Sequence, residues 1–127
     1  MYPLVFHSIN PNNWYSKSKE YQVLNIASEL MRASSWIEKN RPELVNSCYD
    51  RALELIDLTR SDPRWKSGLK ELSRCREYLA SLRWKSEKNR YLNQQLLRGV
   101  IMLNAEAECK LCLKEMIEPL RSLKKCI

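Results

Sequence analysis

Apolar residues recur at every third or fourth position along most of this 127-residue chain, which is the spacing of one face of an α-helix. The pattern predicts four helices, over about 16–40, 41–60, 63–83 and 87–118. A short turn follows Pro119, and residues 1–15 contain two prolines and an Asn-Asn pair that favour an extended N-terminal arm. Short connections make sequential helices antiparallel. The sequence therefore predicts a single all-α domain, a four-helix antiparallel bundle with a long C-terminal helix.

Two segments contain residues that typically start helices. Asn40 stands three residues before Glu43, with Pro42 between them, so we expect Asn40 to cap the second helix in a capping box. Asp62 directly precedes Pro63. This pair predicts an N-cap followed by proline at the first helical position of the third helix.

The predicted fourth helix is longer than the others, and its far end is apolar. At 1.5 Å per residue, its roughly 30 residues span about 45 Å, against about 30–37 Å for helices of about 20–25 residues. The overhang needs cover, from the N-terminal arm or from a second subunit. Its apolar side chains are Leu111, Leu113, Met116, Ile117, Leu120 and Leu123. Because symmetric dimers are the commonest oligomers, we expect these residues to form the interface of a homodimer.

The composition is that of a soluble globular protein. Charged residues make up 29% and apolar residues 44% of the chain, and no apolar run approaches the roughly 20 residues that span a bilayer. The first residues have neither a basic region nor a small-residue cleavage site, so no secretory signal is expected. Five cysteines are an odd number for a disulfide framework. We therefore expect a cytoplasmic protein with reduced thiols and no membrane partner.

The scarcity of glycine and histidine excludes several classes of function. The two glycines, Gly68 and Gly99, cannot build a P-loop or a dinucleotide-binding loop, which need several glycines close together. Both fall inside predicted helices, where the missing side chain lets a second helix approach closely. With His7 as the single histidine, zinc sites with two histidines, di-iron Glu-x-x-His bundles and helical ribonucleases with a late Arg-x4–6-His motif are excluded. The sequence thus favours a non-enzymatic protein without a cofactor.

Cys109 and Cys112 have the CxxC spacing of a redox pair or of half a metal site. They lie deep inside a predicted helix rather than at its start, and nearby glutamates favour the protonated thiols. A zinc ion would need two more ligands, for which the candidates are Cys126, Cys75 and His7. We interpret the two cysteines as apolar packing groups, with a thiol redox or metal function as the alternative.

The formal net charge of +7 is concentrated in one quarter of the chain. Residues 60–90 contain ten Lys/Arg and four Asp/Glu, whereas residues 1–59 contain six and seven, and residues 91–127 six and four. The basic segment alternates cations with aromatic rings, a composition suited to contacting phosphates and stacking an unpaired base. The candidate nucleic-acid-binding residues are Lys66, Lys70, Arg74, Arg83, Trp84, Lys85, Lys88, Arg90 and Tyr91. Three glutamates interrupt the segment, so a solvated charged face is the alternative interpretation.

Two arginines border the apolar face of the predicted third helix, Arg76 and Arg83. A cation at that edge lies close to the neighbouring helix. We therefore expect one of the two to pair with an acid of the second helix, such as Glu54 or Asp57, in a structural ion pair.

Together these patterns favour a small helical protein that acts by binding another macromolecule. The leading hypothesis is a homodimer that also binds an unidentified protein, because the chain combines an overlong apolar helix with no assembled catalytic set. The alternative is a bundle that binds RNA or DNA through the basic segment 60–90.

Overall fold

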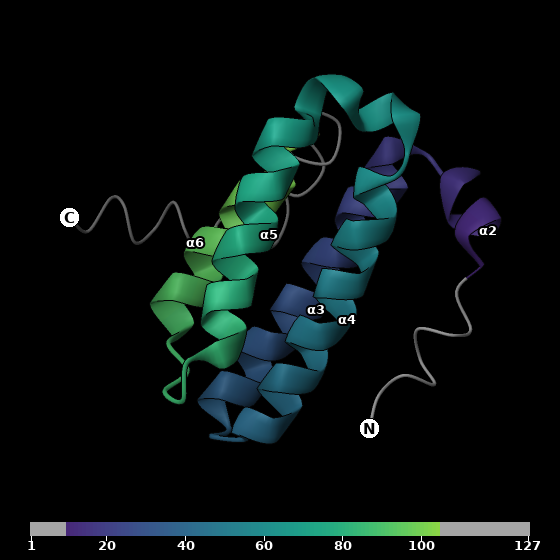
Figure 1. Cartoon of the computed structure of the whole chain (residues 1–127). Coiled ribbons are helices and arrows are strands. Elements are labelled where there is room, and N and C mark those ends of the chain that lie inside the picture. Colours follow the sequence, from purple (N-terminus) through teal and green to yellow (C-terminus); the bar gives the residue numbers. More distant parts are fainter. Residues whose placement is uncertain (1–9, 105–127) are drawn as a thin grey trace.

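The computed structural model describes residues 10–104, and within them the ordered elements are all helical (Figure 1). The elements are α2 (Pro11–Tyr15), α3 (Lys19–Glu38), α4 (Pro42–Arg60), the 3-10 helix η1 (Pro63–Gly68), α5 (Leu69–Trp84) and α6 (Arg90–Ile101). The all-α prediction is confirmed. No helix in the described range is both long enough and apolar enough to cross a membrane.

The four longer helices pack in a closed ring. α3 packs against α4 and α6, and α5 likewise packs against α4 and α6. Each of these helices runs antiparallel to the one before it, because the turns between them are short (Figure 1). The short α2 contacts α4, while η1 contacts both α4 and α5 at one end of the ring.

The core lies inside this ring and is built from one apolar face of each helix. Its largest fully buried side chains include Trp65, Tyr49, Ile26, Leu30 and Ile56. Burying an aliphatic side chain of this size stabilises a fold by about 1.5–3 kcal/mol. The arrangement therefore leaves the outer face of each helix for polar and charged groups.

The prediction that Asn40 caps the second helix is wrong. Asn40 has a φ of 56° and ends α3 instead. Its N–H donates to the carbonyl of Ile37, and the N–H of Arg41 donates to the carbonyl of Trp36. These two bonds form a Schellman motif, in which asparagine tolerates the left-handed conformation better than most residues. Arg41 takes the N-cap position of α4 without a side-chain cap, so the capping box with Glu43 does not form.

The third predicted helix begins where expected but in a different form. The Asp62 side chain accepts a hydrogen bond from the Arg64 N–H, and Pro63 takes the first position, as predicted. The first six residues, however, form the 3-10 helix η1, and the α-helix starts only at Leu69. A Cβ atom on Gly68 would lie 3.4 Å from the Trp65 ring of η1 itself. Gly68 therefore gives room to its own segment rather than to another helix, contrary to the prediction.

The extended arm predicted for residues 1–15 is wrong in its last part. Pro11–Tyr15 form the short helix α2, since Asn10 caps the N–H of Asn12 and proline suits the first helical turn. The next helix, α3, starts at Lys19 rather than near 16. Residues 1–9 lie outside the described residues.

The fourth predicted helix is interrupted. α6 begins at Arg90, behind an Asn89 cap, and ends at Ile101. Residues 102–104 form a turn and a bend, so a continuous helix over 87–118 is wrong at both its start and this point. Residues 105–127 lie outside the described residues. The proposed dimer interface and the pair Cys109 and Cys112 fall in that segment.

Candidate nucleic-acid interface

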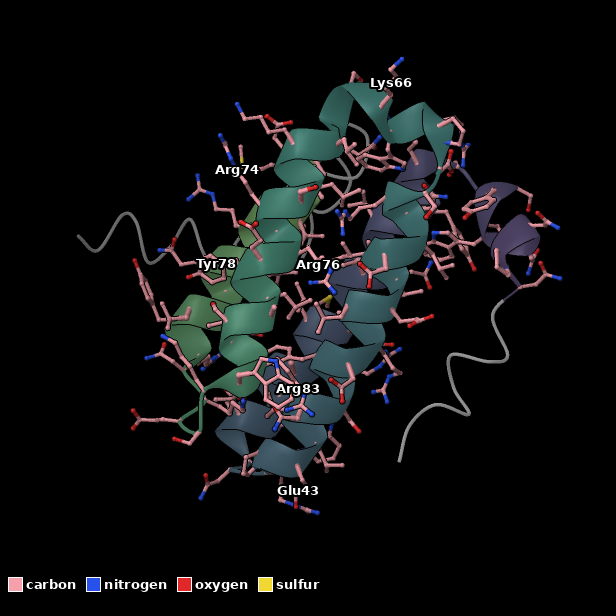
Figure 2. The ribbon with its side chains drawn as sticks, viewed as in Figure 1. Glu43, Lys66, Arg74, Arg76, Tyr78 and Arg83 are labelled. Atoms are coloured by element: carbon pink, nitrogen blue, oxygen red, sulfur yellow. The ribbon has the colours of Figure 1, made fainter. Side chains whose placement is uncertain are left out.

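Several cations of the predicted interface have internal partners. Arg83 Nε donates to Asp50 Oδ1 on α4 over 2.6 Å, and Arg90 forms an ion pair with Glu38 of α3. Arg76 pairs with Asp57 over 2.7 Å, so the expected pairing of an edge arginine with an α4 acid is confirmed for that acid. Figure 2 shows Arg76 and Arg83 on the side of α5 that faces α4. These arginines tie helices together.

Lys88 is also occupied, as the cap of the α5 C-terminus. Its Nζ donates to the carbonyls of Leu82, Arg83 and Lys85, at 3.0, 3.0 and 2.6 Å. A cation at this place compensates carbonyls that the helix itself leaves without donors. Burial, followed by the nearby charge of Arg83, lowers the pKa of Lys88. The prediction that Lys88 contacts phosphate therefore has no geometric support.

Four predicted cations remain exposed with no acid or ring partner among residues 10–104: Lys66, Lys70, Arg74 and Lys85. We call this set the cationic face. At 100° per residue, Lys70, Arg74 and Lys85 project within an arc of about 60° on α5. Lys66 lies on η1, which crosses the end of the ring before α5 begins (Figure 2). Figure 2 shows Lys66 and Arg74 pointing away from the other helices.

Cations on the rest of the described surface differ from the cationic face because most of them have partners. Every lysine and arginine of the described chain before η1 has an acid or an aromatic ring as partner. These residues are Lys17, Lys19, Arg32, Lys39, Arg41, Arg51 and Arg60. The cations without such a partner, which also include Arg98 of α6, lie on η1, α5 or α6, with Lys85 as the C-cap of α5. Glu71 and Glu77 are exposed on α5 three residues either side of Arg74, and neither forms an ion pair with it.

Aromatic rings are exposed beside the cationic face. Trp84, the last residue of α5, is 77% exposed, and Tyr91, the second residue of α6, is 61% exposed. Five of the seven large apolar side chains exposed in the described chain belong to α5, α6 or its cap: Leu69, Tyr78, Trp84, Tyr91 and Met102. The structure thus brings together exposed rings and available cations, two of the components expected from the sequence.

A buried polar cluster at the η1 end was not predicted from the sequence. The Trp65 indole N–H donates to Gln22 Oε1 over 2.7 Å, and Gln22 Nε2 donates to Asp62 Oδ2 and to the Trp14 carbonyl. The Trp14 indole N–H donates to Thr59 Oγ1 over 3.0 Å. Since all five residues are buried and their polar side-chain groups are paired, this clasp joins α2, α3, α4 and η1.

Arg64 seals the clasp from outside. Its guanidinium forms an ion pair with Asp62 over 2.7 Å, and it donates to the carbonyls of Tyr15 and Lys17. The hydrogen bonds from Arg64 lower the pKa of Asp62 to about 2, against the opposing effect of burial. Although Asp62 and Arg64 belong to the basic stretch of the sequence, they are structural.

A second buried pair joins three helices in the middle of the ring. Tyr49 Oη donates to Asn93 Oδ1 over 2.7 Å, and Asn93 Nδ2 donates to the Leu30 carbonyl over 3.0 Å. Both side chains are almost fully buried, and burial strongly raises the pKa of Tyr49. The phenol therefore stays protonated and serves packing.

The described cysteines have the character of packing groups. Cys48 is fully buried and Cys75 is partly buried, and neither is in a disulfide. Burial raises the pKa of both thiols, that of Cys75 to about 11. Cys75 lies opposite Gly99 in an apolar groove of about 320 Å³ between α5 and the end of α6. A Cβ atom at Gly99 would lie 3.8 Å from Cys75 Sγ, an ordinary contact, so the packing of α5 and α6 does not require glycine there, contrary to the prediction.

The described residues contain no group of three His, Cys, Asp or Glu side chains that could hold a metal ion. The comparisons add no relative, since no protein-family model, curated protein or solved structure matches the chain. The case for a function therefore depends on the geometry and charge of the surface formed by η1, α5 and α6.

Proposed function

We propose that the protein binds nucleic acid, RNA or DNA, through the cationic face of η1 and α5. One observation supports this above the others: Lys66, Lys70, Arg74 and Lys85 are exposed and have no acid or ring partner, whereas every other cation in residues 10–104 except the half-buried Arg98 contacts an acid, a ring or backbone carbonyls. Phosphate contacts from such side chains supply most of the affinity in sequence-independent binding.

The spacing of these cations suits an extended anionic chain. Consecutive members Lys66, Lys70 and Arg74 stand four residues apart, which is about 6 Å along an α-helix. From Lys70 to Lys85 the line of cations covers about 22 Å along α5, and Lys66 adds a cation on η1 at one end of the ring. In this proposal α3–α6 act as a four-helix bundle that holds α5 and its outward cations in place.

The salt dependence of binding tests this proposal. With four phosphate contacts on a single strand, the plot of log affinity against log salt concentration should have a slope of about −3. We expect fluorescence anisotropy of a labelled oligonucleotide between 50 and 200 mM salt to give this value. The triple variant Lys66→Gln, Lys70→Gln, Arg74→Gln should bind weakly, with most of the slope lost.

The control variant carries Arg32→Gln, Lys39→Gln and Arg41→Gln, three exposed cations that do not belong to the cationic face. It removes the same net charge from exposed side chains of α3, its C-cap and the N-cap of α4, so it separates a local interface from general attraction. Equal weakening by both triple variants, or no binding of either RNA or DNA by the wild type at low salt, contradicts the proposal.

A protein partner is the second candidate, because Leu69, Tyr78 and Met102 add exposed apolar side chains to the same region. The homodimer predicted through Leu111–Leu123 belongs to this candidate. Light scattering after size exclusion should then give twice the chain mass. Leu113→Glu or Ile117→Glu should shift the dimer to the monomer, and a monomeric wild type at high micromolar concentration would count against it.

A further inference from the structure

We propose that Trp84 is a stacking platform for one unpaired base, so that the bound nucleic acid is single-stranded. The inference rests on the proposed function and names the class of its ligand. It depends on how Trp84 is presented, which differs from every other tryptophan in the described chain.

Trp84 is exposed although its ring is held in place. The side chain is 77% exposed, whereas Trp14 and Trp65 are 6% and 1% exposed and Trp36 is partly buried. The guanidinium carbon of Arg83 lies 4.5 Å from the centroid of the Trp84 ring, within the range of a cation–π contact. The guanidinium thus covers part of the ring, and most of the remainder faces solvent.

The support beneath the ring is itself fixed. Arg83 Nε and Nη2 donate to the two oxygens of Asp50 at 2.6 and 3.4 Å, and both side chains are mostly buried. The Arg83 carbonyl accepts from Lys88, which caps the end of the helix. Asp50 and Arg83 are therefore positioning residues. A platform that is ordered before binding loses less conformational entropy when a ligand stacks on it.

The position of the platform suits a strand that follows the cationic face. Trp84 is the last residue of α5, and the exposed cation Lys85 comes next in extended conformation, with a ψ of 134°. Lys70 and Arg74 lie on the outer side of the same helix. Phosphates bound along α5 bring a base to the end of the helix, where every base can offer a ring face for stacking. Paired bases in a duplex do not offer that face.

Tyr91 marks where a second base would lie. It is 61% exposed at the start of α6, across the short connector from Trp84, and its hydroxyl accepts a hydrogen bond from Gln95. No cation among residues 10–104 lies over the Tyr91 ring, so this hydrogen bond is the one contact in that range that holds its side chain in place. We therefore assign the main stacking contribution to Trp84.

Three probes of equal length separate stacking from charge: an oligouridine, an abasic strand with the same phosphates, and a duplex. Trp84→Ala should weaken oligouridine binding about tenfold, within the range measured for single stacked bases. It should leave the abasic strand and the salt slope unchanged, because no charge is lost. Arg83→Lys should act in the same direction, since lysine keeps the charge but not the planar stack.

Tyr21→Ala is the matched control, because Tyr21 is an exposed ring with Lys17 at 5.2 Å and lies in the first turn of α3, at the η1 end of the ring rather than at the Trp84 end. It should leave all three affinities unchanged. Equal weakening of oligouridine and abasic strand by Trp84→Ala overturns the platform while the proposed function stands. Displacement of oligouridine by polyglutamate of equal charge at equal concentration also overturns it, and indicates an acidic protein partner. Failure of the wild type to bind all three probes overturns the proposed function itself.

Discussion

The two sides of the helical ring differ in what their charged groups do. On α3 and α4, each cation is paired with an acid or a ring, and Glu29 forms ion pairs with both Arg32 and Arg51. On α5, the arginines that face α4 form ion pairs with its acids, whereas the cations of the cationic face have no acid partner among the described residues. The cations of segment 60–90 therefore have two roles. Those that face the neighbouring helix join the two helices, and those that face solvent are available to a ligand.

The difference between the two sides affects which cations can bind a ligand more than it affects the stability of the fold. An exposed ion pair stabilises a protein by less than about 1 kcal/mol, so a missing pair at Lys70 or Arg74 costs the fold little. A buried cluster such as the clasp around Gln22 and Trp65 contributes far more, because each unpaired polar group there would cost about 1–3 kcal/mol. Substitutions on the two sides should therefore affect different measurements.

The largest effect is expected where the clasp loses its central ring. Trp65→Ala removes a side chain that is 1% exposed and leaves Gln22 Oε1 without its donor, so we expect a loss of about 3–5 kcal/mol in the free energy of unfolding. Urea denaturation followed by circular dichroism measures it. Trp84→Ala, the same substitution at an exposed ring, should change stability by less than about 0.5 kcal/mol. Similar losses in both variants would contradict the assignment of one ring to packing and the other to binding.

A pH-dependent effect of about 2 kcal/mol is expected at Asp62. Its pKa is about 2 in the folded protein against an ordinary value of 3.8, so its stabilisation is present above pH 3.8 and disappears as the pH falls toward 2. Asp62→Asn should therefore lower stability at pH 7 and match the wild type near pH 2. Denaturation series at both pH values check this. A constant difference between wild type and variant would show that Asp62 acts through shape alone.

A single cation should change the salt dependence by a smaller but distinct amount. Lys70→Gln removes one phosphate contact and should reduce the slope of log affinity against log salt by about 0.7. The matched change Arg32→Gln, at an exposed cation that does not belong to the cationic face, should leave the slope unaltered. Affinity titrations at four salt concentrations resolve the two. If Arg32→Gln alters the slope equally, the two sides do not differ toward nucleic acid.

The smallest effect is expected for Gly99→Ala on α6, which should change the stability of the protein without changing its affinity for nucleic acid. A Cβ atom at Gly99 would lie 3.8 Å from Cys75 Sγ, an ordinary contact, so Gly99→Ala gains helix propensity without a clash. We expect about 0.5–1 kcal/mol of added stability. Nucleic-acid affinity should stay constant, because no cation or exposed ring changes. A loss of stability would mean that the helices approach more closely than this contact distance implies.

Helical periodicity predicted most of the described helices, but their ends were harder to predict. Asn40 fits an N-cap by its spacing to Glu43, yet the end of α3 needs a left-handed residue at that same position, so the N-cap of α4 falls on Arg41. Asn10 and Pro11 form a start signal like that of Asp62 and Pro63, and the neighbouring asparagines concealed it. At these places two local preferences compete, and tertiary packing decides between them.

The charge map located the candidate interface but did not separate its available cations from its structural ones. Arg83 and Asp50 are 33 positions apart in sequence, so their pairing depends on how α4 and α5 pack. The role of Lys88 could have been predicted from the sequence, because a lysine just beyond the end of a helix often bonds its last carbonyls. The structural role of Gln22 could not be predicted in this way, because one polar residue at the edge of an apolar stripe is common. Its importance depends on its hydrogen bond with Trp65.

The clasp also bears on the order in which the chain folds. Most contacts of an antiparallel helical ring join neighbouring segments, so their loops close at low entropic cost. The clasp instead joins residues 40, 43 and 45 positions apart, through Gln22–Asp62, Gln22–Trp65 and Trp14–Thr59. We expect these bonds to form after the transition state, so that Trp65 variants unfold faster while their folding rate stays close to that of the wild type. The clasp then sets the lifetime of the folded state, independently of the speed at which that state is reached.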